Sequence, residues 1–288
     1  MLISRGSWMS PSSSGSSSSN PLAATHGPHM GESAYHFQLD AASVRFGDVD
    51  ALDQVSISIG AGERIAIVGP SGGGKTTLLR LLNGIVRPAA GSVTTLGEPL
   101  DSLAPERLRE VRSRIGFIHQ HLALVPNLRV VQNVISGKLG RRGLLRSLRD
   151  FFVPGSSDLE QIHTILERVG IGEKLYERTD RLSGGQQQRV AIARALFQEP
   201  LALLADEPVS SVDPARARDT VTLLTQLSEE DGLTLCMSLH NVELASEFFP
   251  RMIGLRRGRV LFDCSPSDLN PSDLKELFNL DSGEAVEP

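Results

Sequence analysis

A glycine-rich loop followed by a lysine and two threonines has the clearest chemical meaning in this sequence. The loop matches the pattern G-x-x-x-x-G-K-[ST], and a short apolar run at residues 64–68 leads directly into it. Glycines let the backbone curl so that its N–H groups point inward at phosphate oxygens, and a helix starting there adds its positive dipole end. The loop therefore predicts a nucleoside triphosphate site rather than a plain turn with an exposed lysine. The residues expected to contact the phosphates are Gly69, Pro70, Ser71, Gly72, Gly73, Gly74, Lys75, Thr76 and Thr77.

A second anion site is indicated much further along the chain. A serine and two glycines precede a strongly helical run at residues 187–197. A hydroxyl, free N–H groups and the helix dipole together can bind phosphate, although Ser183 could also be only the N-cap of that helix. One chain then holds two phosphate sites of different kinds, and a second copy of the chain would allow both to be used. The residues of this second site are Ser183, Gly184, Gly185 and Gln186.

Two consecutive acids follow a buried apolar run and complete the chemistry that hydrolysis needs. Asp206 and Glu207 come directly after residues 201–205, where consecutive acids would be poor strand filler. Asp206 and the hydroxyl of Thr76 are expected to hold Mg²⁺, which prefers oxygen ligands. Glu207, beside the terminal phosphate, can accept a proton from an attacking water.

In this order, the motifs resemble those of the ATP-binding subunits of ATP-binding-cassette (ABC) transporters. The segment 182–186 looks like the family's signature motif, Asp206–Glu207 like its Walker B motif, and 210–213 like its D-loop, with Val212 where leucine is commoner. The resemblance covers about residues 37–269. It implies a P-loop NTPase fold, ATP and Mg²⁺ as ligands, and a head-to-tail homodimer in which the two phosphate sites come from opposite subunits.

The resemblance also assigns four single residues. His240 stands where the switch histidine belongs and would contact the terminal phosphate and position the attacking water. Gln120 stands where the Q-loop glutamine belongs and would be a catalytic residue that reaches Mg²⁺. Phe46 stands where an aromatic stacks on adenine, although it could instead be part of the core. Asp213 caps a helix that starts at Pro214, contacts the partner subunit, or does both. Histidines flank Gln120, but no acid or cysteine completes a metal-ligand set with them.

The elements around these residues predict an α/β class. Residues 37–46 and 51–59 roughly alternate in polarity and indicate strands of an antiparallel β subdomain, whereas 64–68, 201–205 and 233–238 are apolar runs typical of a parallel or mixed sheet. Residues of about 120–182 are mostly helical in pattern and predict an inserted helical subdomain. The predicted organisation is a disordered Ser-rich tail (1–34), an ABC ATPase domain (35–270) and a C-terminal tail (271–288).

Composition narrows the function classes. With 40% hydrophobic and 22% charged residues the chain is typical of globular proteins, and its net charge of −5 gives no reason to expect nucleic-acid binding. No apolar run approaches the roughly 18 residues of a membrane-spanning helix, so a transport role would need a separate permease. Cys236 and Cys264 are too few for a disulfide scaffold or a thiolate zinc site and fit a reducing cytosol.

Two classes of function remain within the family. The first is an importer ATPase at the cytoplasmic face of the inner membrane, served by a permease and a periplasmic or lipid-anchored substrate-binding protein. The second is an ABC ATPase of DNA repair, chromosome organisation or translation. Relatives of that second class carry long coiled coils or two cassettes in tandem. The sequence shows no sustained heptads, one lysine loop and one signature, which favours the importer.

The substrate is indicated by two details that resemble phosphonate importers. A segment at residues 130–140 leads into an insertion at 141–154, and Ser238, Leu239 and Asn241 surround the histidine where most importers have a threonine before it. Phosphite, phosphate and polar amino acids remain alternative substrates. The basic stretch 138–152 is either a solvated helix with an apolar underside or a contact for the permease or anionic headgroups. No inference follows from Cys264, which stands where glycine is usual.

Overall fold

A six-stranded sheet forms the centre of the molecule. The computed structural model describes residues 34–141, 149–209 and 213–278. The strand order is β10-β9-β3-β8-β7-β6, and all neighbours are parallel except the β9–β10 hairpin. Because parallel strands end at the same edge, the segments that follow β3, β7 and β8 meet there. The strands are β3 (Arg64–Val68), β6 (Ile115–Ile118), β7 (Ala202–Ala205), β8 (Thr234–Leu239), β9 (Arg251–Arg256) and β10 (Arg259–Cys264).

A second, antiparallel sheet carries the N-terminal part of the described chain. Its order is β2-β1-β4-β5, with strands β1 (Tyr35–Phe46), β2 (Val49–Gly60), β4 (Ala90–Thr95) and β5 (Glu98–Pro99). Apolar residues of β1 and β2, such as Phe37 and Ile59, face one side and are fully buried. The antiparallel β subdomain predicted from alternating polarity is therefore present, with both strands slightly longer than expected.

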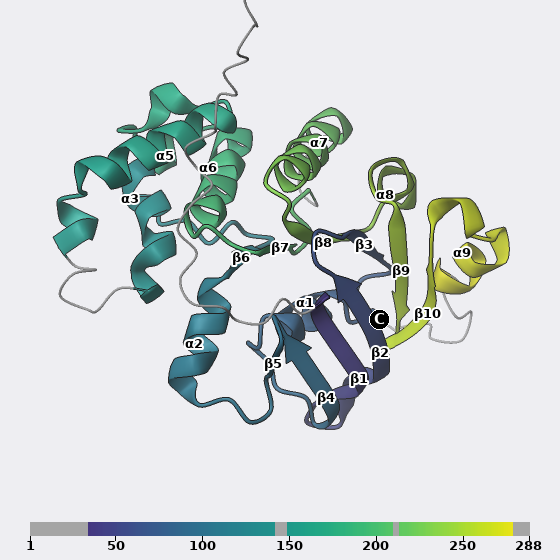
Figure 1. The fold of residues 1–288 in the computed structure, drawn as a ribbon. Helices are drawn as coiled ribbons and strands as arrows, with labels where there is room; N and C mark the ends of the chain where they lie inside the picture. The colour runs from purple at the N-terminus through teal and green to yellow at the C-terminus, as the bar shows by residue number, and fades with distance from the viewer. Residues whose placement is uncertain (1–33, 142–148, 210–212, 279–288) are drawn as a thin grey trace, which may run out of the picture. The chain divides into compact units, whose positions relative to one another are not determined.

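Helices cover the central sheet and form a group of their own beside it. Figure 1 shows α3, α5 and α6 gathered together near the β6 edge, and α7 and α8 near β8 and β9. The α-helices are α1 (Lys75–Leu82), α2 (Pro105–Ser113), α3 (Val130–Ile135), α5 (Ser156–Arg168), α6 (Gly184–Phe197), α7 (Pro214–Glu230), α8 (Val242–Phe248) and α9 (Pro271–Phe278). Short 3₁₀ turns are η1 (Ser136–Arg141), η2 (Gly172–Lys174), η3 (Thr179–Arg181) and η4 (Pro266–Asp268).

The central strands divide their side chains between two hydrophobic cores. Ala66 and Val68 pack into the core formed with α5, α6, α7 and α8, while Ile65 and Ile67 pack into the core shared with α1 and the antiparallel sheet. Successive strand residues point to opposite faces, so a strand that is apolar throughout must be covered on both sides. The α/β P-loop NTPase class with a mixed sheet, an antiparallel sheet and inserted helices is confirmed.

Several boundaries differ from the sequence-based prediction. The run 120–182 contains α3, α5 and three 3₁₀ turns separated by irregular chain, and residues 149–152 are also helical. The C-terminal tail expected at 271–288 begins with the helix α9, and residues 279–288 lie outside the described part. Of the Ser-rich tail, only residue 34 lies inside it. Among the residues that the structure describes, no helix is both long and apolar enough to cross a membrane.

Candidate active site

The glycine loop lies between β3 and α1, at the edge of the sheet where β7 and β8 also end. Gly72 and Gly74 have positive φ values of 76° and 106°, a region that side chains with a Cβ rarely adopt. Gly73 lies so close to the β9–β10 hairpin that a Cβ there would come within 2.8 Å of the Leu255 carbonyl oxygen. The loop therefore needs glycine both for its curvature and for its packing.

The ammonium of Lys75 is turned into this loop. Its Nζ donates to the carbonyl oxygens of Gly69 and Pro70, both at 3.0 Å, and only 3% of the residue is exposed. Burial lowers the pKa of Lys75, and the nearby Glu207 carboxylate opposes that shift. The amine thus lies inside the curl where the phosphates of a nucleotide are expected.

Asp206 follows β7 and is a buried acid with two hydroxyl partners. The Oγ1 of Thr76 donates to its Oδ1 at 2.9 Å, and the Oγ of Ser238 donates to the same oxygen at 3.0 Å. The residue is 4% exposed. A carboxylate and a hydroxyl at this separation match the oxygen ligands that Mg²⁺ prefers. The two residues predicted to hold the ion are therefore adjacent.

Glu207 is the point where the predicted catalytic residues meet. Its Oε1 lies 3.2 Å from the Nζ of Lys75 and 2.7 Å from the Nε2 of His240, and its Oε2 accepts from the Nε2 of Gln120 at 3.1 Å. The backbone of Glu207 is left-handed, with φ of 45°, which is costly for a residue with a Cβ. The structure therefore brings together side chains that are up to 165 residues apart in the sequence.

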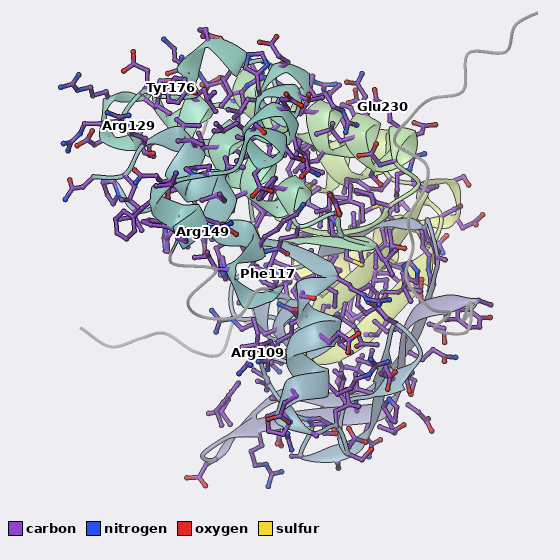
Figure 2. All side chains as sticks on the ribbon, turned by 60° about the vertical axis from the view of Figure 1, so that its left-hand side comes forward. Arg109, Phe117, Arg129, Arg149, Tyr176 and Glu230 are labelled. Carbon is purple, nitrogen blue, oxygen red and sulfur yellow. The ribbon has the colours of Figure 1, made fainter. Side chains whose placement is uncertain are left out.

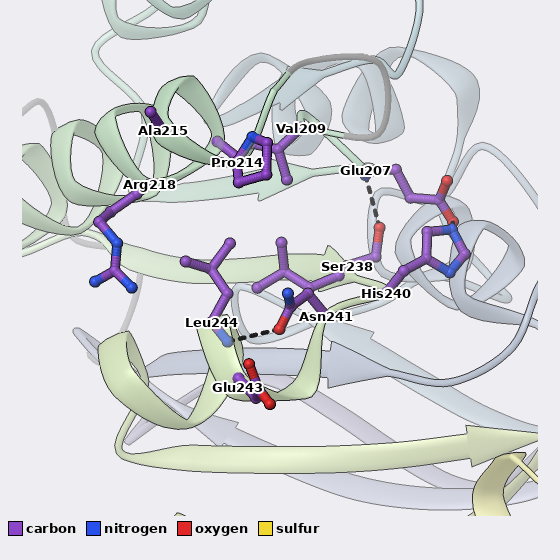
Figure 3. A pocket seen from close by; sticks show the side chains of 12 residues that line it. Glu207, Val209, Pro214, Ala215, Arg218, Ser238, His240, Asn241, Glu243 and Leu244 are labelled. Carbon is purple, nitrogen blue, oxygen red and sulfur yellow. Dashed lines mark hydrogen bonds and ion pairs between the residues drawn. The ribbon is translucent and has the colours of Figure 1, made fainter.

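Ser238 is a site residue that the sequence analysis used only as a substrate marker. Its hydroxyl donates to Asp206 and accepts from the backbone N–H of Glu207 at 2.8 Å. Figure 3 shows this bond beside His240, in a pocket of about 620 Å³ that Glu207, Ser238, His240 and Asn241 help to line. The sequence carried a signal for this role, because Ser238 is the penultimate residue of β8 and lies only two positions before His240, at the strand end that carries the site.

The signature residues occupy the start of α6. The Oγ of Ser183 accepts from the Gln186 N–H at 3.3 Å, and the Oε1 of Gln186 accepts from the Ser183 N–H at 3.0 Å. This reciprocal capping leaves the front of the helix open, because a Cβ on Gly184 or Gly185 would meet nothing within 4 Å. Within the described chain, no hydrogen bond or ion pair joins these residues to Lys75, Asp206 or Glu207.

Phe46 and Asp213 are placed as follows. Phe46 ends β1 with 52% of its surface exposed, so the alternative that it belongs to the core is wrong. Asp213 is the N-cap of α7, where its Oδ1 accepts from the Arg216 N–H at 3.1 Å. Its predicted contact with a partner subunit stays a prediction, and residues 210–212 of the D-loop lie outside the described chain.

The basic stretch at 138–152 contains one residue that is not solvated. Lys138 is buried, donates to Gln161 and Glu199 at 2.9 Å each, and lies over the Phe197 ring. For this residue the expectation of a solvated or membrane-facing lysine is wrong, because it joins η1 to α5 and α6. Phe152 is exposed, and residues 142–148 lie outside the described chain.

Comparison with known proteins adds a family and named relatives. A family model described as ABC transporter matches residues 52–210. A phosphonates import ATP-binding protein PhnC of Pseudomonas entomophila is 45% identical over 252 residues, covering 87% of this chain and 95% of the relative. One of the same name from Anaeromyxobacter dehalogenans is 43% identical over 92% of this chain, which spans only 54% of that relative.

Solved structures agree with the sequence relatives. The ATP-binding cassette MJ0796, described as a dimer in a post-hydrolysis state bound to ADP and Pi, aligns with a TM-score of 0.69 and 31% identity over 80% of this chain and 98% of its own. CbiO1 of Clostridium perfringens, part of the ABC transporter complex cbiONQ, aligns with a TM-score of 0.70 and 27% identity over 82% of this chain and 90% of its own.

Proposed function

The chain belongs to the ABC transporter family, and from that premise we propose that it is the ATP-hydrolysing subunit of a phosphonate importer. The observation that carries the proposal is the convergence of Lys75, Gln120 and His240 on Glu207, beside the Thr76–Asp206 pair. These side chains come from four separate segments, those that follow β3, β6, β7 and β8, and lie at one edge of the sheet. Such an arrangement suits the transfer of a phosphoryl group to water.

The reaction is the hydrolysis of ATP to ADP and phosphate. A water oxygen forms a bond to the γ-phosphorus while the bond from that phosphorus to the β,γ-bridging oxygen breaks. Glu207 accepts the proton that the water loses, which is general-base work for a carboxylate. His240 and Gln120, both within hydrogen-bond distance of Glu207, hold its carboxylate and orient the water. Lys75 and the loop N–H groups stabilise the charge on the phosphate oxygens.

Mg²⁺ is proposed as the metal that accompanies ATP. Thr76, Asp206 and Gln120 would hold it, and the 2.9 Å hydroxyl–carboxylate pair of Thr76 and Asp206 supplies the hard oxygen ligands that it prefers. When bound, the ion neutralises charge on the phosphates. Ser238 keeps Asp206 in place by donating to the oxygen that Thr76 also contacts.

The complete site is proposed to need two copies of the chain. Ser183, Gly184, Gly185 and Gln186 lie at an open helix start that the single chain does not bring to Lys75. A two-fold dimer would place this helix start of one subunit against the loop of the other, twice. The dimeric cassette with ADP and Pi among the similar structures supports this arrangement.

Phosphonate is proposed as the cargo, carried by a separate permease and delivered by a substrate-binding protein, with this chain at the cytoplasmic face of the inner membrane. Relatives with the printed name phosphonates import ATP-binding protein, 43–46% identical in several Pseudomonas species and in Anaeromyxobacter, support this cargo. The cassette itself does not touch the cargo, so the proposal depends on those relatives rather than on the site.

Uptake by cells tests this proposal. A strain that lacks the chain should lose growth on an alkylphosphonate as sole phosphorus source and keep growth on phosphate. The wild-type chain should restore growth, whereas Lys75→Ala should not. Phosphite and a polar amino acid complete the panel of cargoes. If the deletion strain lost uptake of phosphite or of the amino acid and kept normal phosphonate uptake, the cargo would be that compound and not a phosphonate.

A further inference from the structure

The turn that carries Gln120 is strained. After β6, the backbone N–H of Leu122 donates to the His119 carbonyl at 2.9 Å, so Gln120 is the second residue of a tight turn. Two and three residues after Gln120 the backbone is left-handed without glycine: Leu122 has φ of 58° and Ala123 has φ of 48°. Such a conformation costs free energy and persists only when the surroundings hold it. Figure 2 labels Phe117, a residue of β6 that lies three positions before Gln120.

One arginine on α6 binds both strained residues. The Nη2 of Arg194 donates to the Leu122 carbonyl at 2.7 Å, and its Nη1 donates to the Ala123 carbonyl at 2.5 Å. No carboxylate lies within ion-pair distance of Arg194 in the described parts of the chain, and desolvation lowers its pKa. A desolvated guanidinium without a counter-ion is costly, so an apolar side chain would be a less costly filler at this place.

The same loop is fastened a second time, to the segment that precedes Ser183. The side-chain amide of Asn133 accepts from the Val125 N–H at 2.9 Å and donates to the Val125 carbonyl at 3.0 Å. It also donates to the Thr179 hydroxyl at 2.8 Å, and Thr179 lies four residues before Ser183. The far end of the loop is thus held to the chain that enters α6.

We propose that Arg194 is a positioning residue that fixes the Gln120 turn to α6, so that Gln120 reaches Glu207 only when the signature helix is in place. Ser183 caps the N-terminus of α6 and Arg194 lies eleven residues later, about 16 Å along the helix axis. A displacement of α6 at its Ser183 end therefore moves the Leu122 and Ala123 carbonyls to which Arg194 donates. In this way the start of α6, which the proposed dimer places at the partner's nucleotide, is coupled to the residues around Glu207 that act on the chain's own nucleotide. This inference depends on the proposed ATP hydrolysis for its kinetic consequence, but not for its structural one.

The structural consequence is tested by hydrogen–deuterium exchange, measured by mass spectrometry on the full chain. Arg194→Met should speed exchange in peptides covering residues 119–125. Arg189→Met is the matched control, since Arg189 lies on the same helix and donates to a different backbone carbonyl, that of Val169. The control should speed exchange near Val169 and leave 119–125 unchanged. Unchanged exchange at 119–125 in Arg194→Met overturns the proposal, whatever the ATPase activity.

The kinetic consequence is tested by a double-mutant cycle with Gln120→Ala. Arg194→Met should lower kcat about tenfold without changing the Kd for a fluorescent ATP analogue more than about twofold, and should add nothing to the loss in Gln120→Ala. Arg194→Lys, which keeps the charge but offers one donor nitrogen in place of two, should recover part of kcat and serves if Arg194→Met folds poorly. Additive losses, as expected for Arg189→Met, would mean that Arg194 acts independently of Gln120 and would overturn the proposal. A wild-type chain that hydrolyses no ATP would instead contradict the proposed function, while the exchange test would still decide this inference.

Discussion

The Nζ of Lys75 lies 3.2 Å from the Oε1 of Glu207, so the phosphate-binding lysine and the proposed general base form an ion pair. His240 contacts the same carboxylate oxygen at 2.7 Å. A nucleotide entering the loop must draw Lys75 away from Glu207, because one ammonium cannot serve both the carboxylate and the phosphates at full strength. The charge of Glu207 therefore opposes ATP binding while its basicity promotes hydrolysis.

Glu207→Gln should separate these two effects. Removing the base is expected to lower kcat by about 100-fold or more. Removing the negative charge leaves Lys75 to the phosphates, so the Kd for ATP should stay the same or fall. Steady-state ATPase assays and titration with a fluorescent ATP analogue give both numbers. Glu229→Gln, which removes a carboxylate from an exposed pair with Arg64, should leave both unchanged. Normal turnover in Glu207→Gln would remove Glu207 from the role of base.

Ser238→Ala should weaken the proposed metal site. The hydroxyl both donates to Asp206 and accepts from the Glu207 N–H, so its loss frees the carboxylate and leaves a partly buried N–H unpaired. We expect a higher Mg²⁺ concentration for half-maximal ATPase activity and a several-fold lower kcat. Ser228→Ala is the control, because that equally buried hydroxyl donates to the Leu233 carbonyl far from the site. It should lower the melting temperature alone. An unchanged Mg²⁺ requirement in Ser238→Ala would contradict the prediction.

Mixing two inactive chains should restore a composite site. Lys75→Ala removes the loop amine and Ser183→Arg fills the front of the signature helix, so each homodimer is defective in both of its sites. Their heterodimer has one site with Lys75 from one chain and Ser183 from the other. ATP-dependent dimerisation, measured by size-exclusion chromatography in the Glu207→Gln background, should recover in the mixture. If the Ser183→Arg chain alone dimerises normally on ATP, Ser183 is only a helix cap.

Gly258→Ala should loosen the glycine loop from outside the active site. Gly258, in the β9–β10 turn, donates its N–H to the Gly73 carbonyl at 3.0 Å and has φ of 76°. A Cβ there would lie 2.8 Å from the Ala51 carbonyl oxygen, so the turn must move. Loss of that hydrogen bond predicts about tenfold weaker ATP binding. Gly47→Ala, equally left-handed but in open space, should cost about 1 kcal/mol of stability and leave ATP binding unchanged.

His36 predicts a pH dependence of stability. Burial lowers its pKa, and its Nδ1 lies 2.7 Å from the Thr234 hydroxyl. The folded state binds the proton less readily than the unfolded state. The contribution of His36 to the free energy of unfolding should therefore be complete at pH values above the ordinary pKa of histidine and should decline as the pH falls below it. Melting temperatures from pH 7.5 to 5.5 should fall less steeply for His36→Gln than for the wild type. The slope should not vanish, because burial also lowers the pKa of His119. A steeper slope in His36→Gln would contradict this sign.

Local pattern predicted much of the fold and the residues at the strand ends. Residues 64–68 form an apolar run that is long enough for a strand but too short for a helix and ends at a glycine, and β3 has those bounds. The strand β6 was missed, because Ile115–Ile118 is four residues long and contains a glycine. The β9–β10 hairpin was missed as well, since arginines at its ends and turn give it neither a continuous nor an alternating apolar pattern.

The contacts that hold the site in place were beyond prediction from the sequence. Arg194 reads as an ordinary helix arginine, and only the approach of α6 to the Gln120 turn shows that it binds two backbone carbonyls. Lys138 read as part of a basic surface, yet the packing of η1 against α5 and α6 buries it. In both cases a long, flexible side chain reaches a partner more than 20 residues away, which periodicity does not record.

Because the amine of Lys75 is buried, lysine acylation can be used to follow opening of the glycine loop. The sequence contains four lysines, Lys75, Lys138, Lys174 and Lys275, among 29 basic residues. Lys138 is enclosed by its partners, whereas Lys275 is exposed. Lysine acylation needs access for the reagent, which burial denies to Lys75. The rate of acylation at Lys75, relative to the rate at Lys275 on the same molecule, therefore reports how often the glycine loop opens.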